Sequence, residues 1–126
     1  MNDRQGMTYA RNKALGSYGE GVAARHLTDA GMVVLERNWT CRFGEIDIVA
    51  RDGDTLVFVE VKTRSGTSHG TNLEAVTQAK AERLRTLAGA WLEGRAIRPP
   101  VTRIDVVAVQ IPAKGPAEVR HVKAVA

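Results

Sequence analysis

Three charged residues in the middle of the chain could carry out phosphate chemistry. Glu60 and Lys62 flank Val61 inside a long apolar run. Because successive side chains of a strand alternate between its two faces, Glu60 and Lys62 share one face. Asp47 lies between two isoleucines in the preceding apolar segment. Burying an unpaired charge is costly, so these side chains are expected to pair, to bind a metal or to lie at a cleft.

The turn Asp52–Asp54 decides whether Asp47 and Glu60 lie on the same face of a hairpin. If Gly53 and Asp54 form a two-residue loop, Asp47 lies directly across from Glu60, and if the loop is one residue earlier the two are diagonal neighbours. Opposite β-carbons are about 4.5–5.5 Å apart and diagonal ones about 7–8 Å, so a cation can span either pair. A three-residue loop would put Asp47 and Glu60 on opposite faces of the hairpin. A metal site shared by the two therefore predicts a loop with an even number of residues or a compensating bulge.

The ligand types favour a hard divalent cation. Carboxylate oxygens without a histidine or cysteine cluster suit Mg²⁺ or Mn²⁺ better than zinc. Lys62 would then help to ionise water or neutralise charge that develops on a phosphate. The alternative is a strand-face ion pair between Glu60 and Lys62, with Asp47 in a hydrogen bond near the turn.

Hydrophobic periodicity and turn residues predict the element order αβββαββ. The expected helices cover residues 9–30 and 77–93, and the expected strands cover residues 32–39, 46–51, 55–63, 101–111 and 119–126. Gly31 and Gly94 are placed to end the helices, and Thr77 to cap the second one. A glycine-rich loop is expected over residues 65–72. The apolar stretch 56–59 predicts a central strand that is covered on both faces.

Composition indicates one folded domain with a basic surface. The 126 residues have 44% hydrophobic content and a net charge of +4, which favours polyanionic partners. A single cysteine, Cys41, excludes an internal disulfide and a zinc site of several thiolates. No apolar stretch is long enough for a membrane helix, and the first residues lack a secretory signal, which predicts a cytoplasmic protein.

The segment GEIDIVARDGDTLVFVEVKTR over residues 44–64 resembles the signature of the YraN family of endonuclease-like proteins. GSYGE in the first helix, AVTQAK at the start of the second and the strand RIDVVAV extend the resemblance over most of the chain. That family is similar to Holliday junction resolvases and restriction enzymes of the PD-(D/E)xK nuclease superfamily. The resemblance implies a restriction-endonuclease-like core, an α/β fold with a central mixed sheet flanked by helices.

The resemblance also implies roles for individual residues. Asp47, Glu60 and Lys62 take the D and ExK positions, and Glu20 takes the carboxylate position of the first helix. Asp47, Glu60 and the Val61 carbonyl would hold the metal, with Glu20 supporting the metal or its water.

Basic and amide side chains near the second helix are candidates for contacts with nucleic acid. Gln78 and Lys80 lie in the first turn, where free N–H groups favour phosphate, and they resemble the glutamine and lysine that nuclease relatives place near the scissile phosphate. Arg64 and Arg83 are candidates to follow the phosphate backbone.

The leading hypothesis is a magnesium-dependent endonuclease that hydrolyses phosphodiester bonds in DNA, with branched or repair intermediates as candidate substrates. The first alternative is a nucleic-acid-binding module that retains the nuclease fold without turnover. The second is an interaction domain whose acidic residues are simply paired. Resolvases act as dimers, so a homodimer is an expectation by analogy.

Overall fold

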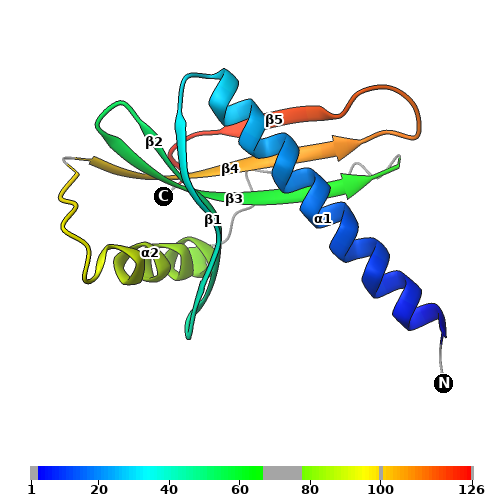
Figure 1. Cartoon of the computed structure of the whole chain (residues 1–126), viewed down its shortest axis with the longest axis horizontal. Coiled ribbons are helices and arrows are strands. Elements are labelled where there is room, and N and C mark those ends of the chain that lie inside the picture. Colours follow the sequence, from blue (N-terminus) through cyan, green and yellow to red (C-terminus); the bar gives the residue numbers. More distant parts are fainter. Residues whose placement is uncertain (1–2, 67–77, 100, 126) are drawn as a thin grey trace.

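The computed structural model describes residues 3–66, 78–99 and 101–125, and in these ranges five strands form one mixed sheet with a helix on each face (Figure 1). The elements in chain order are α1 (Asp3–Asp29), β1 (Val33–Cys41), β2 (Gly44–Asp52), β3 (Thr55–Ser65), α2 (Gln78–Leu92), β4 (Val101–Ile111) and β5 (Glu118–Val122). The strands lie side by side in chain order, with β3 and β4 parallel and the other pairs antiparallel. The predicted order αβββαββ and the α/β class are confirmed.

The hairpin of β2 and β3 has the even loop that the metal hypothesis requires. Asp52 pairs with Thr55, so Gly53 and Asp54 form a two-residue loop, and Gly53 adopts a φ of 61°. Such tight loops need a residue that tolerates a positive φ, and glycine does so without a steric cost. The loop is even, as the metal hypothesis requires, and of the two registers that the sequence left open the structure has the one that places Asp47 directly across from Glu60.

The ends of α1 differ in how well the sequence predicted them. Gly31, with a φ of 93°, ends the helix, and the N–H groups of Gly31 and Met32 bond to the carbonyls of Thr28 and Leu27. This is the Schellman arrangement expected of a helix stop at glycine. At its other end α1 begins at Asp3, six residues before the predicted start, because the apolar pattern used to find the helix begins only further along the chain.

Two hydrophobic clusters fill the two faces of the sheet. On one face Ala23 and Leu27 of α1 pack with apolar residues of β2, β3 and β4. On the other face Leu84 and Trp91 of α2 pack against Phe58 and its neighbours. Residues 56–60 of β3 are all buried, which confirms the expectation of a central strand covered on both faces. By contrast, Tyr18 of α1 is 57% exposed.

Several sequence expectations concern the remaining segments. Most of the expected glycine-rich loop, and the expected cap Thr77, lie outside the described residues. Gly94 follows α2 with a φ of 78°, in agreement with its predicted role as a helix stop. Cys41 is a free, partly buried cysteine at the end of β1. No helix in the described part of the chain is long and apolar enough to cross a membrane.

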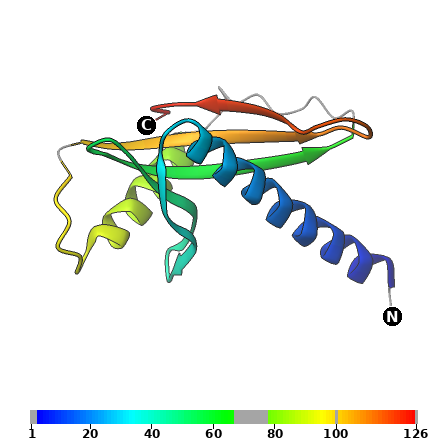
Figure 2. The ribbon, with the colours of Figure 1, turned by 45° about the horizontal axis from the view of Figure 1, so that its top comes forward.

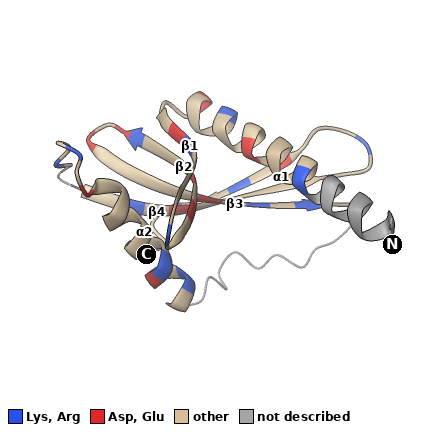
Figure 3. Cartoon of the chain, turned by 60° about the horizontal axis from the view of Figure 1, so that its bottom comes forward, with Lys and Arg blue, Asp and Glu red and all other residues tan. Residues whose placement is uncertain are grey.

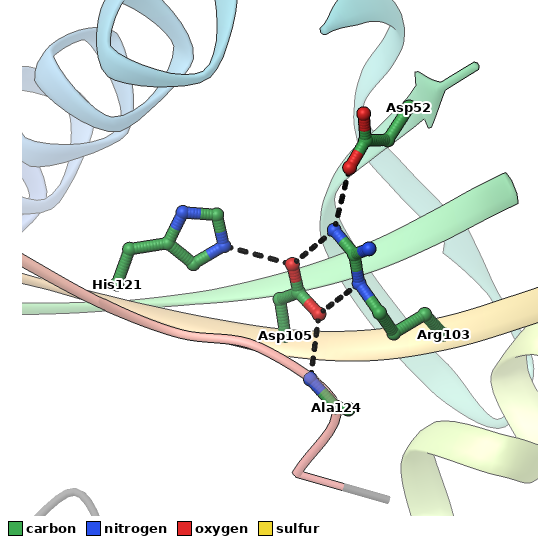
Figure 4. A network of polar contacts seen from close by, with 5 residues as sticks. All are labelled: Asp52, Arg103, Asp105, His121 and Ala124. Carbon is green, nitrogen blue, oxygen red and sulfur yellow. Dashed lines mark hydrogen bonds and ion pairs between the residues drawn. The ribbon is translucent and has the colours of Figure 1, made fainter. Parts of the chain in front are cut away.

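A buried polar network joins β4 to the C-terminal segment (Figure 4). The fully buried carboxylate of Asp105 accepts two hydrogen bonds from Arg103, at 2.9 and 3.0 Å, and one from the Ala124 N–H. His121 Nε2 lies 2.8 Å from the same carboxylate, and Arg103 also donates to Asp52. Burial favours a higher pKa for Asp105, but the hydrogen bonds from Arg103, Ala124 and His121 outweigh it and hold the pKa below its ordinary value. The network therefore fixes β5 and the following residues to the sheet.

The hairpin of β1 and β2 leaves the plane of the sheet at its far end. Figure 2 shows this hairpin turning away from the flat array of β3, β4 and β5, toward the side on which α2 and the start of α1 project. The pairing of β1 with β2 shifts register between Val34 and Glu36, and bulges of this kind increase the local twist of a strand. This bend separates the beginning of β2 from β3, which pair only from Ile48 onward.

Candidate metal centre

Asp47 lies at the point where β2 separates from β3. The recorded pairing of these strands ends at Ile48 and Val59. Beyond it, Asp47 Oδ2 accepts a hydrogen bond of 2.8 Å from the Val61 N–H. A backbone N–H in a buried strand requires an acceptor, and here a side-chain carboxylate supplies it. The bond fixes Asp47 beside the segment that contains Glu60 and Lys62.

Helix α1 reaches β3 through a glycine. A β-carbon built on Gly19 would lie 1.9 Å from Thr63 Oγ1, a distance that no side chain can occupy. The backbone of α1 therefore packs directly on β3 at this point, and the next residue, Glu20, comes close to Asp47. Between helix and strand lies a pocket of about 220 Å³, which is lined by Leu15, Gly16, Glu20, Asp47, Val61 and Thr63.

Two carboxylates that line this pocket, Glu20 and Asp47, lie close to a third, Glu45, and we call these three residues the acidic cluster. One oxygen of each lies within 4.8 Å of one oxygen of each of the others. Glu20 Oε1 is buried and has no hydrogen-bond partner among the described residues. Like charges this close repel one another unless a proton or a cation is shared between them.

The electrostatics of the acidic cluster show this repulsion. Burial raises the pKa of Asp47 to about 7; the hydrogen bond from Val61 opposes the rise, while Glu45 and Glu20 add to it. Burial and the charge of Glu45 also raise the pKa of Glu20, against the opposing effects of Arg37 and Asn38. Binding of a cation to carboxylates with raised pKa values would release a proton.

The donor set fits a hard divalent cation. All three ligands are carboxylate oxygens, and one buried oxygen of Glu20 has no partner among the described residues. Mg²⁺ and Mn²⁺ prefer such oxygen ligands. These three carboxylates could hold such a cation; the set shares Asp47 and Glu20 with the predicted ligands, adds Glu45 and lacks Glu60.

Glu60 lies outside the acidic cluster. Its side chain follows Phe58 on the face of β3 that α2 covers, and only 9% of the residue is exposed. Glu60 Oε1 forms ion pairs with Lys80 Nζ at 3.1 Å and with Arg83 Nη2 at 3.6 Å. Figure 3 shows basic residues of this kind, in blue, near the beginning of α2. The sequence predicts Asp47 and Glu60 around one cation. In the structure they belong to two adjacent groups: Asp47 to the acidic cluster on the α1 side of β3, and Glu60 to the ion pairs with Lys80 and Arg83 on the α2 side.

The physical reason for this difference is the path of β2. The register of the hairpin places Asp47 opposite Glu60, as the even loop predicts, but the two strands no longer pair at that level. Asp47 bonds to the Val61 N–H and faces the pocket under α1, whereas the alternation of β3 directs Glu60 to α2. Glu60 Oε2 is also buried without a hydrogen-bond partner in the described part of the structure.

Lys62 lies on the same face of β3 as Glu60, the face that α2 covers. A side-chain hydrogen bond with Lys80, followed by burial, lowers the pKa of Lys62, and the charge of Glu60 opposes the effect. Neighbouring cations also contribute, namely Lys80 and Arg64. A lysine with a lowered pKa loses its proton more easily than an exposed one.

The remaining candidates for nucleic-acid contacts lie close to this group. Lys80 and Arg83 belong to α2 and pair with Glu60, and about half of the Arg83 side chain is exposed. Arg64 is exposed near the end of β3. Gln78 is the first residue of α2, and its side chain lies outside the described part of the structure.

Glu45 is the residue that sequence reasoning missed. It is two positions before Asp47 in β2, and residues i and i+2 of a strand share a face. That spacing is the same signal that singled out Glu60 and Lys62. It could have been applied to Glu45 and Asp47, but the contribution of α1 to the cluster depends on the close approach at Gly19.

Comparison with known proteins places most of the chain in one family. The family described as "Uncharacterised protein family UPF0102" matches residues 19–109, a range that includes the acidic cluster, Glu60 and Lys62. A UPF0102 protein of Kineococcus radiotolerans is 60% identical over 121 residues, which cover 94% of this chain and 99% of the relative. Relatives from Nocardioides sp. and Streptomyces coelicolor are 53% and 56% identical and cover 92% and 90% of this chain and 94% and 88% of their own lengths. The chain therefore belongs to the UPF0102 family.

Proposed function

We propose that this protein is a metal-dependent endonuclease that hydrolyses phosphodiester bonds in DNA, built on a restriction-endonuclease-like core. One observation carries the proposal. The acidic cluster lies one hydrogen bond away from the strand segment Glu60–Lys62, because Asp47 accepts the Val61 N–H. Carboxylates of α1 and β2 that could hold a cation thus lie next to the part of β3 that carries a lysine of lowered pKa.

The acidic cluster supplies the ligands for Mg²⁺ or Mn²⁺. Glu20, Glu45 and Asp47 would hold the ion, and the pocket under α1 leaves room for water. When bound, such an ion polarises a phosphate oxygen and lowers the pKa of a coordinated water. Glu20 and Asp47 have raised pKa values, so binding of the cation near neutral pH is expected to release a proton.

The cationic group on the other side of Val61 supplies proton transfer and charge neutralisation. In hydrolysis, the oxygen of water forms a bond to phosphorus, the bond to the leaving oxygen breaks, and a proton moves from the water. Lys62, with its lowered pKa, can accept that proton. Lys80 and Arg83, which are paired with Glu60, would neutralise charge on the phosphate.

A nucleic acid as substrate also agrees with the charge of the whole chain. The net charge is +4, and the arginines at the end of β3 and on α2 are exposed. Phosphate contacts by such residues provide affinity without sequence specificity. The proposal therefore predicts binding that weakens as the salt concentration rises.

A second candidate function is binding of nucleic acid without cleavage. The observation that favours it is the ion-pairing of Glu60 with Lys80 and Arg83, which satisfies Glu60 Oε1 without a metal ion. In that case Lys62 contributes only charge. Lys62→Ala would then cause a modest, salt-dependent loss of affinity.

The test combines metal binding and cleavage in the same samples. Thermal unfolding of the wild type, Asp47→Ala and the exposed control Glu93→Ala is measured with and without millimolar Mg²⁺ or Mn²⁺. The samples are then incubated with labelled branched DNA, linear DNA and RNA. We expect the metal to raise the unfolding midpoint of the wild type and of Glu93→Ala only, and these two proteins to cut DNA.

Two outcomes would decide against the endonuclease. If metal leaves the unfolding midpoint of the wild type unchanged and no strand is cut, the protein is not a metal-dependent endonuclease. If Asp47→Ala cuts DNA at the rate of the wild type, the acidic cluster is not the site of the reaction. Binding that persists without cleavage supports the second candidate.

A further inference from the structure

An aromatic and a basic side chain form the tip of the hairpin that leaves the sheet. Cys41 pairs with Gly44, so Arg42 and Phe43 are the two residues of the turn, which we call the hairpin tip. Phe43 is 47% exposed, and the Arg42 guanidinium lies 4.8 Å from the centre of its ring. In Figure 2 this hairpin projects beyond the layer formed by β3, β4 and β5.

The fold does not require an aromatic residue at this turn. Tight turns favour glycine, asparagine, aspartate and proline, whose backbone preferences stabilise them. Exposing much of a phenyl ring to water forfeits the favourable free energy of burying it. The core instead uses Ile46, which is buried against α2. Phe43 thus lies above the packed part of the hairpin and contributes little to it.

The residues next to the hairpin tip nevertheless pack against α2. Gly44 has a φ of 138°, which closes the turn, and its β-carbon position lies 3.7 Å from Leu87 of α2. Trp39 and Cys41 on the opposite strand pack against the same cluster as Leu87. The ring is therefore presented on a rigid support, which lowers the entropy lost when a ligand stacks on it.

The hairpin tip is adjacent to the acidic cluster. Glu45 of that cluster follows Phe43 by two residues, so their α-carbons lie at most about 7 Å apart. This is about two base steps of a stacked nucleic-acid strand. A nucleotide next to a phosphate held at the acidic cluster therefore lies within reach of the ring.

We infer that Phe43 stacks on an unpaired base next to the phosphate at the acidic cluster, with Arg42 contributing positive charge to the same nucleotide. The inference rests on the proposed function and specifies its substrate class. Because the faces of bases inside a duplex are covered by their neighbours, Phe43 can stack only where a base is free. The substrate is then a nucleic acid with single-stranded character at the cleavage site, such as a single strand, a flap or a branch point.

Equilibrium binding of labelled oligonucleotides tests the inference. Fluorescence anisotropy is measured in millimolar Mg²⁺ with single-stranded DNA and with a blunt duplex of the same sequence, both made with phosphorothioate linkages that resist cleavage. The proteins are the wild type, Phe43→Ala, Phe43→Tyr and Leu35→Ala. Leu35 is a matched control because it is also exposed, at 44%, on β1 but away from the turn.

Stacking predicts a selective loss of affinity. Stacking on an aromatic side chain contributes about 1–3 kcal/mol per base, so Phe43→Ala should weaken binding of the single strand by about 5-fold to 150-fold. Phe43→Tyr keeps the ring and should bind like the wild type. Leu35→Ala should leave both affinities unchanged, and Phe43→Ala should change duplex affinity little.

The outcomes separate the inference from the proposed function. Equal affinity of Phe43→Ala and the wild type for the single strand overturns the inference, as does an equal loss for single strand and duplex. If, in addition, the wild type and Phe43→Ala cut DNA alike while Asp47→Ala does not, only the inference fails. If the wild type binds no oligonucleotide, the inference and the proposed function fall together.

Discussion

Replacing Asp47 by asparagine should make the protein more stable at alkaline pH in the absence of metal. The fold raises the pKa of Asp47 from 3.8 to about 7, chiefly through burial. A raised pKa means that the folded state favours the neutral carboxyl group. The contribution of Asp47 to stability is therefore complete below about pH 3.8 and is lost as the pH rises through about 7. Asparagine is neutral at every pH, so it avoids this loss.

The magnitude follows from the same shift. A change of about three pKa units corresponds to about 4 kcal/mol at most, since each unit is about 1.4 kcal/mol. Solvent screens the partly exposed carboxylate of Asp47, so we expect a gain of about 1–2 kcal/mol in the free energy of unfolding. The asparagine carbonyl oxygen can still accept the Val61 N–H, so the hydrogen bond at 2.8 Å need not be lost.

The assay is urea unfolding of the wild type, Asp47→Asn and the exposed control Glu93→Gln, in a chelator, at about pH 8.5 and about pH 4. Asp47→Asn should be more stable than the wild type at the higher pH and similar to it at the lower pH, where Asp47 is largely protonated. Glu93→Gln should show no such pH-dependent gain. In millimolar Mg²⁺ the order should reverse, because only the wild type has the full set of carboxylate ligands.

Two results would refute this reasoning. A loss of stability in Asp47→Asn at about pH 8.5 would mean that the ionised carboxylate is satisfied in the fold. An equal gain at both pH values would mean that the effect comes from packing or from the unfolded chain rather than from the ionisation of Asp47.

Three further predictions concern the support of the site, the second polar network and the proposed proton acceptor. Gly19→Ala should lower the free energy of unfolding by about 1–3 kcal/mol, because its β-carbon would overlap Thr63; Thr63→Ala in the same chain should recover part of the loss in urea unfolding, and no recovery would show that the overlap is not the cause. Asp105→Asn should cost about 3 kcal/mol or more, because it removes the charge on which Arg103 depends. Since the pKa of Asp105 is lowered, the stability that it contributes is present above its unfolded pKa and is lost as the pH falls through its folded pKa; unfolding curves that coincide for Asp105→Asn and the wild type at neutral pH would contradict the prediction. Lys62→Arg should bind DNA in an anisotropy assay but not cut it, because arginine does not release its proton, and cleavage at the rate of the wild type would rule out proton transfer by Lys62.

The sequence by itself determined the order of the elements and the even length of one hairpin loop. Gly31 and Gly94 ended the helices, and Asp52–Asp54 set the even loop between β2 and β3. These features depend on backbone preferences and on neighbours within a few residues, so they can be recognised along the chain. The buried run before Glu60 likewise identified β3 as the central strand.

Only the tertiary structure decided which charged groups meet. The departure of β2 from β3 turned Asp47 to the Val61 N–H and the pocket under α1, while Glu60 turned to the cations of α2. Glu20 joined Asp47 because Gly19 lets the helix backbone approach the strand. Strand coiling and the path of α1 across the sheet result from packing over the whole core, between residues far apart in the chain. A local pattern therefore identified the residue types of the site but not their grouping.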